Sequence, residues 1–180
     1  DALHLLVIGG SLGAQRLNEI VPEAIGLMLE DARPRVLHQT GRAKLEMTRQ
    51  RYNDYGVEAR IEEFIDDMAA AYGWADLVIC RAGAMTVFEL AAAGVASILV
   101  PYPYAVDDHQ TANAQYLADA GAAIVKQQRD LTSEWLSETI TEMTRQRDRL
   151  VSMASAARKI AKPDAASQVA DCCMQAGGMA

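Results

Sequence analysis

Short apolar runs alternate with longer amphipathic segments along the whole chain. The short runs are rich in Val, Ile and Leu, which is typical of buried strands, whereas the longer segments repeat their apolar positions at helical spacing. The pattern predicts strands at 5–8, 35–38, 58–61, 76–80, 97–100 and 122–125. It predicts helices at 15–30, 43–55, 67–74, 86–93, 108–120, 133–144 and 147–161, with one more over 164–175.

This alternation predicts an α/β fold with a Rossmann-like parallel sheet flanked by helices on both faces. The 180 residues contain no internal repeat and no low-complexity linker, and a chain of this length can bury one substantial core. Pro163 breaks the helical pattern, so we expect one domain over 1–162 and a C-terminal helix or tail over 163–180. Sheets of this kind bind ligands beyond the carboxyl ends of their strands, where this sequence places its unusual turns.

The first such turn is GGSLGA at 9–14. Its glycines allow a ligand to approach the backbone closely, and the Ser11 hydroxyl with the following N–H groups suits a phosphate or diphosphate. The glycine spacing departs from the dinucleotide fingerprint and the Walker lysine is absent, which disfavours a nicotinamide or flavin cofactor and an ATPase. The alternative is a tight turn with no ligand.

The stretch CRAGAMTVFELAAAG at 80–94 joins a strand to a helix through small residues. Free N–H groups at such a helix start favour an anion. Glu89 lies three residues after Thr86, on nearly the same helix face. A carboxylate beside a phosphate site suits two neighbouring hydroxyls, as on a ribose. A capping box formed by Thr86 and Glu89 is the alternative, and both interpretations stay open at this point.

Two further loops carry candidate binding residues. Phe64 and Ile65 are apolar where polar residues are usual, so they could line a slot for a flat base, with the Ile65 backbone reading its edge. From the residues alone we favour a hydrophobic staple ahead of a helix capped by Asp66 or Asp67.

After the fifth strand, Gln110 and Asn113 share one helix face, and their amide groups suit sugar hydroxyls. His109 beside capping acids can equally be a solvated histidine, and His38 at a strand end is interpreted as a packed core histidine. No pair of carboxylates resembles a glycosidase site, and no cluster of residues reads as a metal site.

The composition of the chain argues against several classes of function. A formal net charge of −7 argues against nucleic acid as a partner, although a nucleotide needs only a few local donors. Cys80, Cys172 and Cys173 have no metal-like spacing, and we expect a reducing cytosol and no structural disulfide. Residues 1–30 show no signal-peptide pattern, and no stretch is apolar enough to span a bilayer.

Taken in order, GGSLGA, HQTGR, the FIDDM segment, CRAGAMTVFEL and DDHQ-x-x-NA resemble the C-terminal half of the MurG family over residues 5–126. Members of that family are N-acetylglucosaminyltransferases that convert lipid I to lipid II in peptidoglycan synthesis. The family has a GT-B fold of two Rossmann-like domains. The resemblance implies that this chain is the half that binds the donor UDP-N-acetylglucosamine, with no cofactor and no metal.

The resemblance also implies roles for individual residues. Ser11 would contact the diphosphate, Ile65 would meet uracil through its backbone, and Glu89 would bind the ribose hydroxyls. Residues 84–86 would bracket the diphosphate and sugar, and 109–110 would face the N-acetylglucosamine. The implied donor-binding residues are Ser11, Ile65, Ala84, Met85, Thr86, Val87, Phe88, Glu89, His109 and Gln110.

The resemblance covers only about half of a family member, so we expect this chain to bind donor without transferring sugar. The catalytic base, the lipid I site and the membrane contact would belong to the missing N-terminal half of a cytoplasmic protein peripheral to the plasma membrane. No catalytic residue is assigned here. Three alternatives stay open: the donor half of another GT-B enzyme such as a UDP-sugar epimerase, a non-catalytic nucleotide-sugar-binding module, and an NAD-dependent Rossmann protein.

Overall fold

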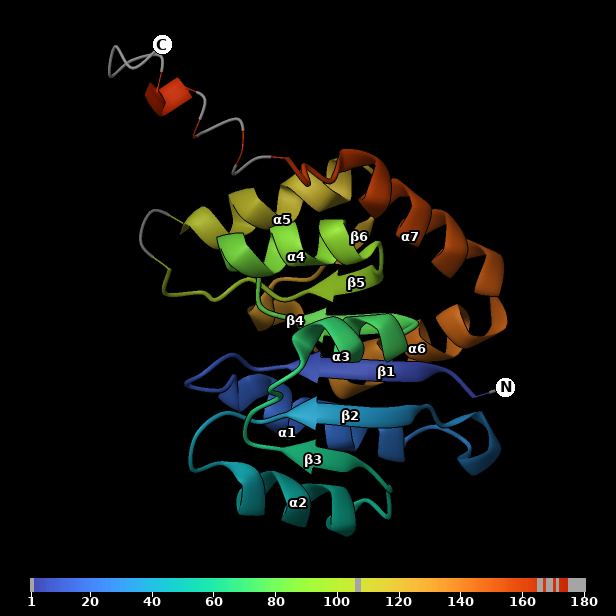
Figure 1. The fold of residues 1–180 in the computed structure, drawn as a ribbon. Coiled ribbons are helices and arrows are strands. Elements are labelled where there is room, and N and C mark those ends of the chain that lie inside the picture. Colours follow the sequence, from blue (N-terminus) through green and yellow to red (C-terminus); the bar gives the residue numbers. More distant parts are fainter. Residues whose placement is uncertain (1, 106–107, 165–166, 168–169, 171, 175–180) are drawn as a thin grey trace.

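A computed structural model shows one sheet of six parallel strands with helices on both faces (Figure 1). It describes residues 2–105, 108–164, 167, 170 and 172–174. The strands are β1 (His4–Ile8), β2 (Arg35–Gln39), β3 (Arg60–Glu62), β4 (Leu77–Cys80), β5 (Ala96–Leu99) and β6 (Ala123–Val125). The helices are α1 (Gln15–Gly26), α2 (Leu45–Asp54), α3 (Met68–Trp74), α4 (Ala84–Ala93), α5 (His109–Asp119), α6 (Ser133–Arg145) and α7 (Arg147–Ile160), with short 3-10 helices η1 (Glu30–Ala32) and η3 (Gln128–Asp130).

The strand order β3-β2-β1-β4-β5-β6 reverses direction at β1. The chain first builds outward from β1 through β2 to β3, and then returns to place β4 on the other side of β1. Ile8 is in register with Gln39 on β2 and with Cys80 on β4. The loops that follow these strands therefore leave the sheet at one edge, and a crevice opens between β1 and β4 where the order reverses.

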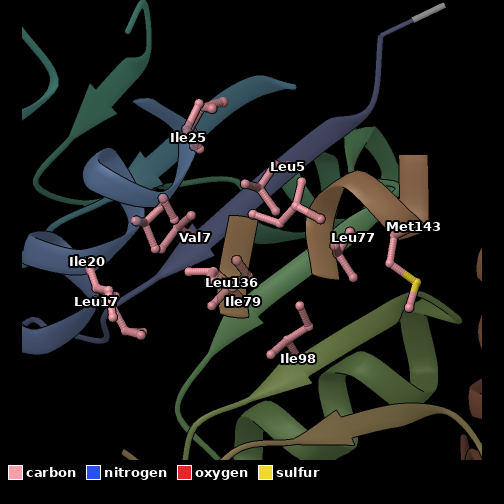
Figure 2. Close-up of a cluster of buried hydrophobic side chains, with 14 of the residues drawn as sticks. Leu5, Val7, Leu17, Ile20, Ile25, Leu77, Ile79, Ile98, Leu136 and Met143 are labelled. Atoms are coloured by element: carbon pink, nitrogen blue, oxygen red, sulfur yellow. The ribbon is translucent and has the colours of Figure 1, made fainter. Parts of the chain in front are cut away.

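Alternate residues of each strand enter two separate cores. Leu5 and Val7 of β1 pack with Leu17 of α1 and Leu136 of α6 on one face of the sheet (Figure 2). Leu6 and Ile8 of β1 pack with residues of α3, α4 and α5 on the other face. Because both faces are covered, the strands read in the sequence as continuous apolar runs rather than as an alternation of polar and apolar residues.

The predicted strands and the helices up to residue 161 are present, with shifted ends. The helix predicted over 15–30 ends at Gly26. Gly26 lies where a Cβ atom would come within 2.8 Å of the Cβ of Tyr55, so α1 ends against the end of α2 and the chain turns back toward β2. Half of the residues of the helix predicted over 164–175 lie outside the described residues, so this helix and the boundary at 162 stay predictions. No helix in the described part of the chain is long and apolar enough to cross a bilayer.

Candidate functional site

Two helices begin at the crevice between β1 and β4 without a side-chain cap. The N-cap residue of α1 is Ala14 and that of α4 is Gly83, and neither makes a side-chain hydrogen bond to the first turn. The first-turn N–H groups of α4, at 84–86, therefore have no side-chain acceptor among the described residues. The positive ends of both helix dipoles lie at the same crevice. This arrangement suits a phosphate or diphosphate.

The turn before α1 depends on its glycines. Gly10 and Gly13 have φ values of 77° and 69°, in the left-handed region that other residues rarely adopt. A Cβ atom on Gly9 would come within 2.7 Å of the backbone nitrogen of Ala14. The turn closes through a 2.9 Å hydrogen bond from Gly13 N to Gly10 O. These constraints leave Ser11 exposed at the tip of the turn.

A groove of about 820 Å³ runs along this crevice. The glycine turn, the starts of α1 and α4, and the loop after β5 form its walls. The predicted binding residues that line it are Ser11, Thr86 and Gln110. Arg16, Lys44 and Arg81 line it as well, so the groove has a local excess of cationic side chains although the chain as a whole is acidic. Such a groove favours an anionic ligand.

Arg81, which directly follows β4, is a groove residue that the sequence did not single out. Its Nη1 donates to the carbonyl oxygens of Val100 at 3.1 Å and Pro101 at 3.3 Å. Its Nη2 donates to Gln128 Oε1, and its guanidinium lies 5.5 Å from the centre of the Tyr102 ring. Burial lowers the pKa of Arg81 from its ordinary value, but an arginine remains protonated at neutral pH. A fixed positive charge therefore lies beside the helix ends.

Glu89 lies one turn further along α4, exposed and on the side of α3. Because α4 begins at Ala84 after the N-cap Gly83, Thr86 is not the N-cap, and the capping-box interpretation of Thr86 and Glu89 is wrong. Glu89 Oε2 instead accepts a hydrogen bond from the Tyr72 hydroxyl at 3.0 Å. The carboxylate is thereby left with acceptor capacity for other hydroxyls.

The loop after β3 contains the predicted helix cap but not the hydrophobic staple, because Asp67 is the N-cap and the residue before it is the acidic Asp66. Asp67 caps α3, since its Oδ1 accepts from Ala70 N at 2.9 Å, which confirms the cap. Ile65 packs its partly buried side chain against the second core and lines a separate hollow of about 700 Å³ between the sheet and α3. No backbone hydrogen bond joins Ile65 to another described residue. Its peptide groups thus remain available to a ligand.

The other predicted residues of α4 and α5 face different surroundings. Val87 is 2% exposed and lies in the core beneath α4, and its backbone N–H donates to Gly83 O at 3.0 Å. Phe88 packs on Tyr116 of α5, with 6.0 Å between ring centres. Met85 is exposed at the helix start, and His109 is the exposed first residue of α5. None of these side chains lines the 820 Å³ groove.

Gln110 and Asn113 both bind the backbone of Ala82 in the turn before α4. Gln110 Oε1 accepts from Ala82 N at 3.2 Å and from Tyr102 N at 2.9 Å, and Asn113 Nδ2 donates to Ala82 O at 3.1 Å. Asn113 therefore positions this turn, contrary to the expectation that it faces sugar hydroxyls. Gln110 Nε2 has no hydrogen-bond partner among the described residues, and it remains as a donor at the groove.

Buried polar groups beneath the site are inert. His38 is fully buried and bonded to Tyr52 and Asn18, as the core interpretation predicted. Burial raises the pKa of Cys80 to about 12, so this thiol stays protonated. All three cysteines are free. Within the described ranges, no group of three or more His, Cys, Asp and Glu residues is arranged to hold a metal ion.

The fold is a doubly wound α/β domain, as the strand order shows. Its switch-point crevice, with two helix ends that lack a side-chain cap, suits an anionic ligand. Residues 4–169 match the glycosyltransferase family 28 C-terminal domain, and the chain belongs to this family. This result confirms the glycosyltransferase fold class that the sequence predicted.

Individual proteins of known name show a more specific relationship than the family model does. It is 54% identical over 172 residues to the UDP-N-acetylglucosamine--N-acetylmuramyl-(pentapeptide) pyrophosphoryl-undecaprenol N-acetylglucosamine transferase of Pseudomonas fluorescens (strain SBW25), covering 96% of this chain and 48% of that protein. The enzyme of the same name from Marinobacter nauticus is 55% identical over 174 residues, with 97% and 48% covered. A crystal structure of Acinetobacter baumannii MurG matches with a TM-score of 0.87 at 47% identity, covering 95% of this chain and 49% of that one. The predicted resemblance to the MurG family is confirmed, and the chain spans about half the length of these relatives.

Proposed function

We propose that this chain is the donor-binding half of an inverting glycosyltransferase that moves N-acetylglucosamine from UDP-N-acetylglucosamine to lipid I, forming lipid II. Support comes from relatives named for this transfer at 54–55% identity over nearly the whole chain. The observation that carries the proposal is the meeting of two uncapped helix ends beside Arg81 at the switch point. The donor is a nucleotide diphosphate, which is the kind of anion that such a crevice favours.

The first task of this half is to stabilise the leaving group. As the bond between the anomeric carbon and the diphosphate breaks, negative charge grows on UDP. The N–H groups at 84–86 and the guanidinium of Arg81 are held in place before the reaction by the α4 start and by the carbonyls of Val100 and Pro101. Little reorganisation is then needed as the charge develops. A helix N-terminus contributes about 0.3–2 kcal/mol toward an anion, and the reaction as proposed uses no metal and no cofactor.

The second task is to recognise the rest of the donor. Ser11 would bind the diphosphate from the glycine turn, and the free backbone of Ile65 would read the edge of uracil. Glu89, oriented by Tyr72, would accept from the two ribose hydroxyls. Gln110 would donate from Nε2 to the N-acetylglucosamine. Its oxygen is already bound to backbone, so this contact is a donation only.

The remaining predicted residues would form the rim of the site. Ala84 and Met85 would contribute backbone N–H groups to the diphosphate, and His109 would lie near the sugar. Val87 and Phe88 would hold the start of α4 in place, because the buried Val87 donates from its backbone N–H to Gly83 O at 3.0 Å and Phe88 packs on α5.

The transfer itself would need the other half of the enzyme. We place the catalytic base, the lipid I site and the membrane contact there, and the whole protein on the cytoplasmic face of the membrane. This chain alone should bind donor without transferring sugar. Adding a separately expressed N-terminal half should restore transfer, which a non-catalytic binding module would not show.

Calorimetric titration with a set of nucleotides tests the proposal. We expect UDP-N-acetylglucosamine and UDP to bind, with UDP-glucose and a TDP-sugar binding more weakly and NAD not binding. A preference for UDP-glucose or a TDP-sugar would favour another GT-B enzyme. Stabilisation by NAD without stabilisation by UDP would favour a dehydrogenase-type domain and would refute the proposal.

A further inference from the structure

A single buried side chain connects two loops of the site. Gln39, the last residue of β2, is 4% exposed. Its Oε1 accepts from Gly10 N at 3.0 Å, and its Nε2 donates to Gly10 O at 3.0 Å. The same Nε2 donates to Glu63 O at 2.9 Å. One amide thus joins the glycine turn after β1 to the loop after β3, which leads to Ile65.

Backbone packing fixes the glycine turn against the loop after β2. A Cβ atom on Gly13 would come within 2.1 Å of Thr40 O, and a Cβ atom on Gly41 would come within 2.2 Å of Gly13 N. Arg42 N donates to Ser11 O at 3.2 Å. The two turns are in direct contact, so a shift of one must move the other.

A buried hydrogen-bond network supports this contact from below. Asn18 Nδ2 donates to Thr40 O at 3.0 Å, so its Oδ1 is the acceptor for His38 Nε2 at 3.0 Å. His38 Nδ1 then accepts from the Tyr52 hydroxyl at 2.8 Å. The side chains of Asn18, His38 and Tyr52 each have a hydrogen-bond partner within this network, which makes the network rigid. The loop after β2 is therefore a fixed reference for the loops on either side of it.

We propose that Gln39 is a positioning residue that sets the distance between the diphosphate and uracil subsites. This inference rests on the proposed function, in which the glycine turn binds the diphosphate and the loop at Ile65 binds uracil. Gln39 touches neither part of the donor itself. Only a side-chain amide can accept from one N–H and donate to two carbonyls at once; a carboxylate at this position would face two carbonyl oxygens without a proton to donate.

The spacing matters only for a ligand that occupies both subsites. UDP gains affinity because binding of one end holds the other end near its own loop. Uridine alone and pyrophosphate alone each use one loop and do not depend on the distance between the loops. A defect in positioning should therefore weaken UDP selectively, whereas a general loss of structure should weaken all three ligands together.

The test uses Gln39→Met, which keeps the length of the side chain and removes its hydrogen bonds. Thr139→Val is the matched control, because Thr139 is also buried and its hydroxyl donates to Trp135 O at 2.8 Å within α6, a helix that lines neither the groove nor the hollow at Ile65. Affinities for UDP, uridine and pyrophosphate are measured by calorimetry and NMR titration, and folding is checked by thermal unfolding. If Gln39→Met does not fold, Gln39→Asn replaces it; this variant keeps the amide but is one methylene too short to reach both loops.

We expect Gln39→Met to bind UDP at least about tenfold more weakly, the loss of one to two buried hydrogen bonds. Uridine and pyrophosphate should stay within about threefold of wild type, and Thr139→Val should bind all three as wild type does. Unchanged UDP affinity in Gln39→Met, or an equal loss for all three ligands, would overturn the inference. Absence of UDP binding by the wild-type chain would instead refute the proposed function and the inference with it.

Discussion

The hydroxyl of Tyr72 on α3 donates a hydrogen bond to the carboxylate of Glu89 on α4, with 3.0 Å between Tyr72 Oη and Glu89 Oε2. Burial raises the pKa of Tyr72, and the nearby Cys80 and Glu89 raise it further. The hydroxyl is therefore protonated at any physiological pH and acts as the donor. Glu89 is an exposed side chain that would otherwise sample several rotamers. Tyr72 holds one of its oxygens and leaves the other to a ligand.

Replacing Glu89 should weaken UDP binding through the ribose. Hydrogen bonds to a charged group contribute about 1.5–3 kcal/mol, so Glu89→Ala should lower UDP affinity about ten- to a hundredfold. The same change should matter much less for 2′-deoxy-UDP, which lacks one of the proposed hydroxyl donors. Calorimetry with both ligands checks this. An equal loss for UDP and 2′-deoxy-UDP would contradict a contact between Glu89 and the 2′-hydroxyl.

Removing the Tyr72 hydroxyl should give a smaller effect of the same kind. Tyr72→Phe keeps the ring and frees the Glu89 carboxylate, and UDP affinity should fall about three- to tenfold. Tyr116→Phe is the matched control, because its hydroxyl donates to Ile160 O, at the end of α7, at 2.9 Å and not to Glu89. In a Glu89→Ala background, Tyr72→Phe should have no further effect on UDP. A full additional loss there would show that Tyr72 acts independently of Glu89.

His38 should make the fold sensitive to acid. Burial lowers the pKa of His38 from 6.5 to about 3, so between these values the unfolded chain binds a proton that the folded chain does not. Stability should therefore fall as the pH drops below about 6.5, by up to about 1.4 kcal/mol per pH unit from this group. Urea unfolding of wild type and His38→Gln between pH 7 and 5 isolates this contribution. Parallel pH profiles for the two proteins would contradict it.

Ser97 on β5 offers a test of the core. Its side chain is fully buried, and its Oγ atom has no hydrogen-bond partner among the described residues. A buried hydroxyl without a partner costs about 1–3 kcal/mol, so Ser97→Ala should leave stability unchanged or raise it by about 1 kcal/mol. Thermal unfolding measures the change. A clear loss of stability would mean that the hydroxyl has a partner, such as a buried water.

The sequence predicted the sheet well because parallel strands buried on both faces leave an unmistakable apolar pattern. It placed the glycine turn for a similar reason, since positive φ values at Gly10 and Gly13 demand glycine. The fixed strand-end charge of Arg81 was not foreseen, because its partners, the carbonyls of Val100 and Pro101, come from another strand end. Sequence spacing does not reveal which backbone groups a side chain will meet across the sheet.

The role of Asn113 shows the same limit. Its position on the helix face was predicted, but the choice between a sugar hydroxyl and the Ala82 carbonyl depends on how α5 packs on the turn before α4. The start of α4 at Ala84 rather than 86 was missed because small residues continue a helix as readily as they form a turn. Because α4 begins two residues earlier, Thr86 and Glu89 do not form a capping box, and the Glu89 carboxylate accepts a hydrogen bond from Tyr72 instead.

The most direct test of donor binding at the crevice is an NMR titration of the isotopically labelled chain with UDP-N-acetylglucosamine. If the donor binds there, the largest amide shifts fall in the glycine turn at 9–14 and at the start of α4 at 83–86, with further shifts near Ile65. Shifts confined to the hollow of about 990 Å³ beside β3 and α2, lined by residues such as Arg33 and Arg60, or the absence of shifts at saturating donor, would contradict it.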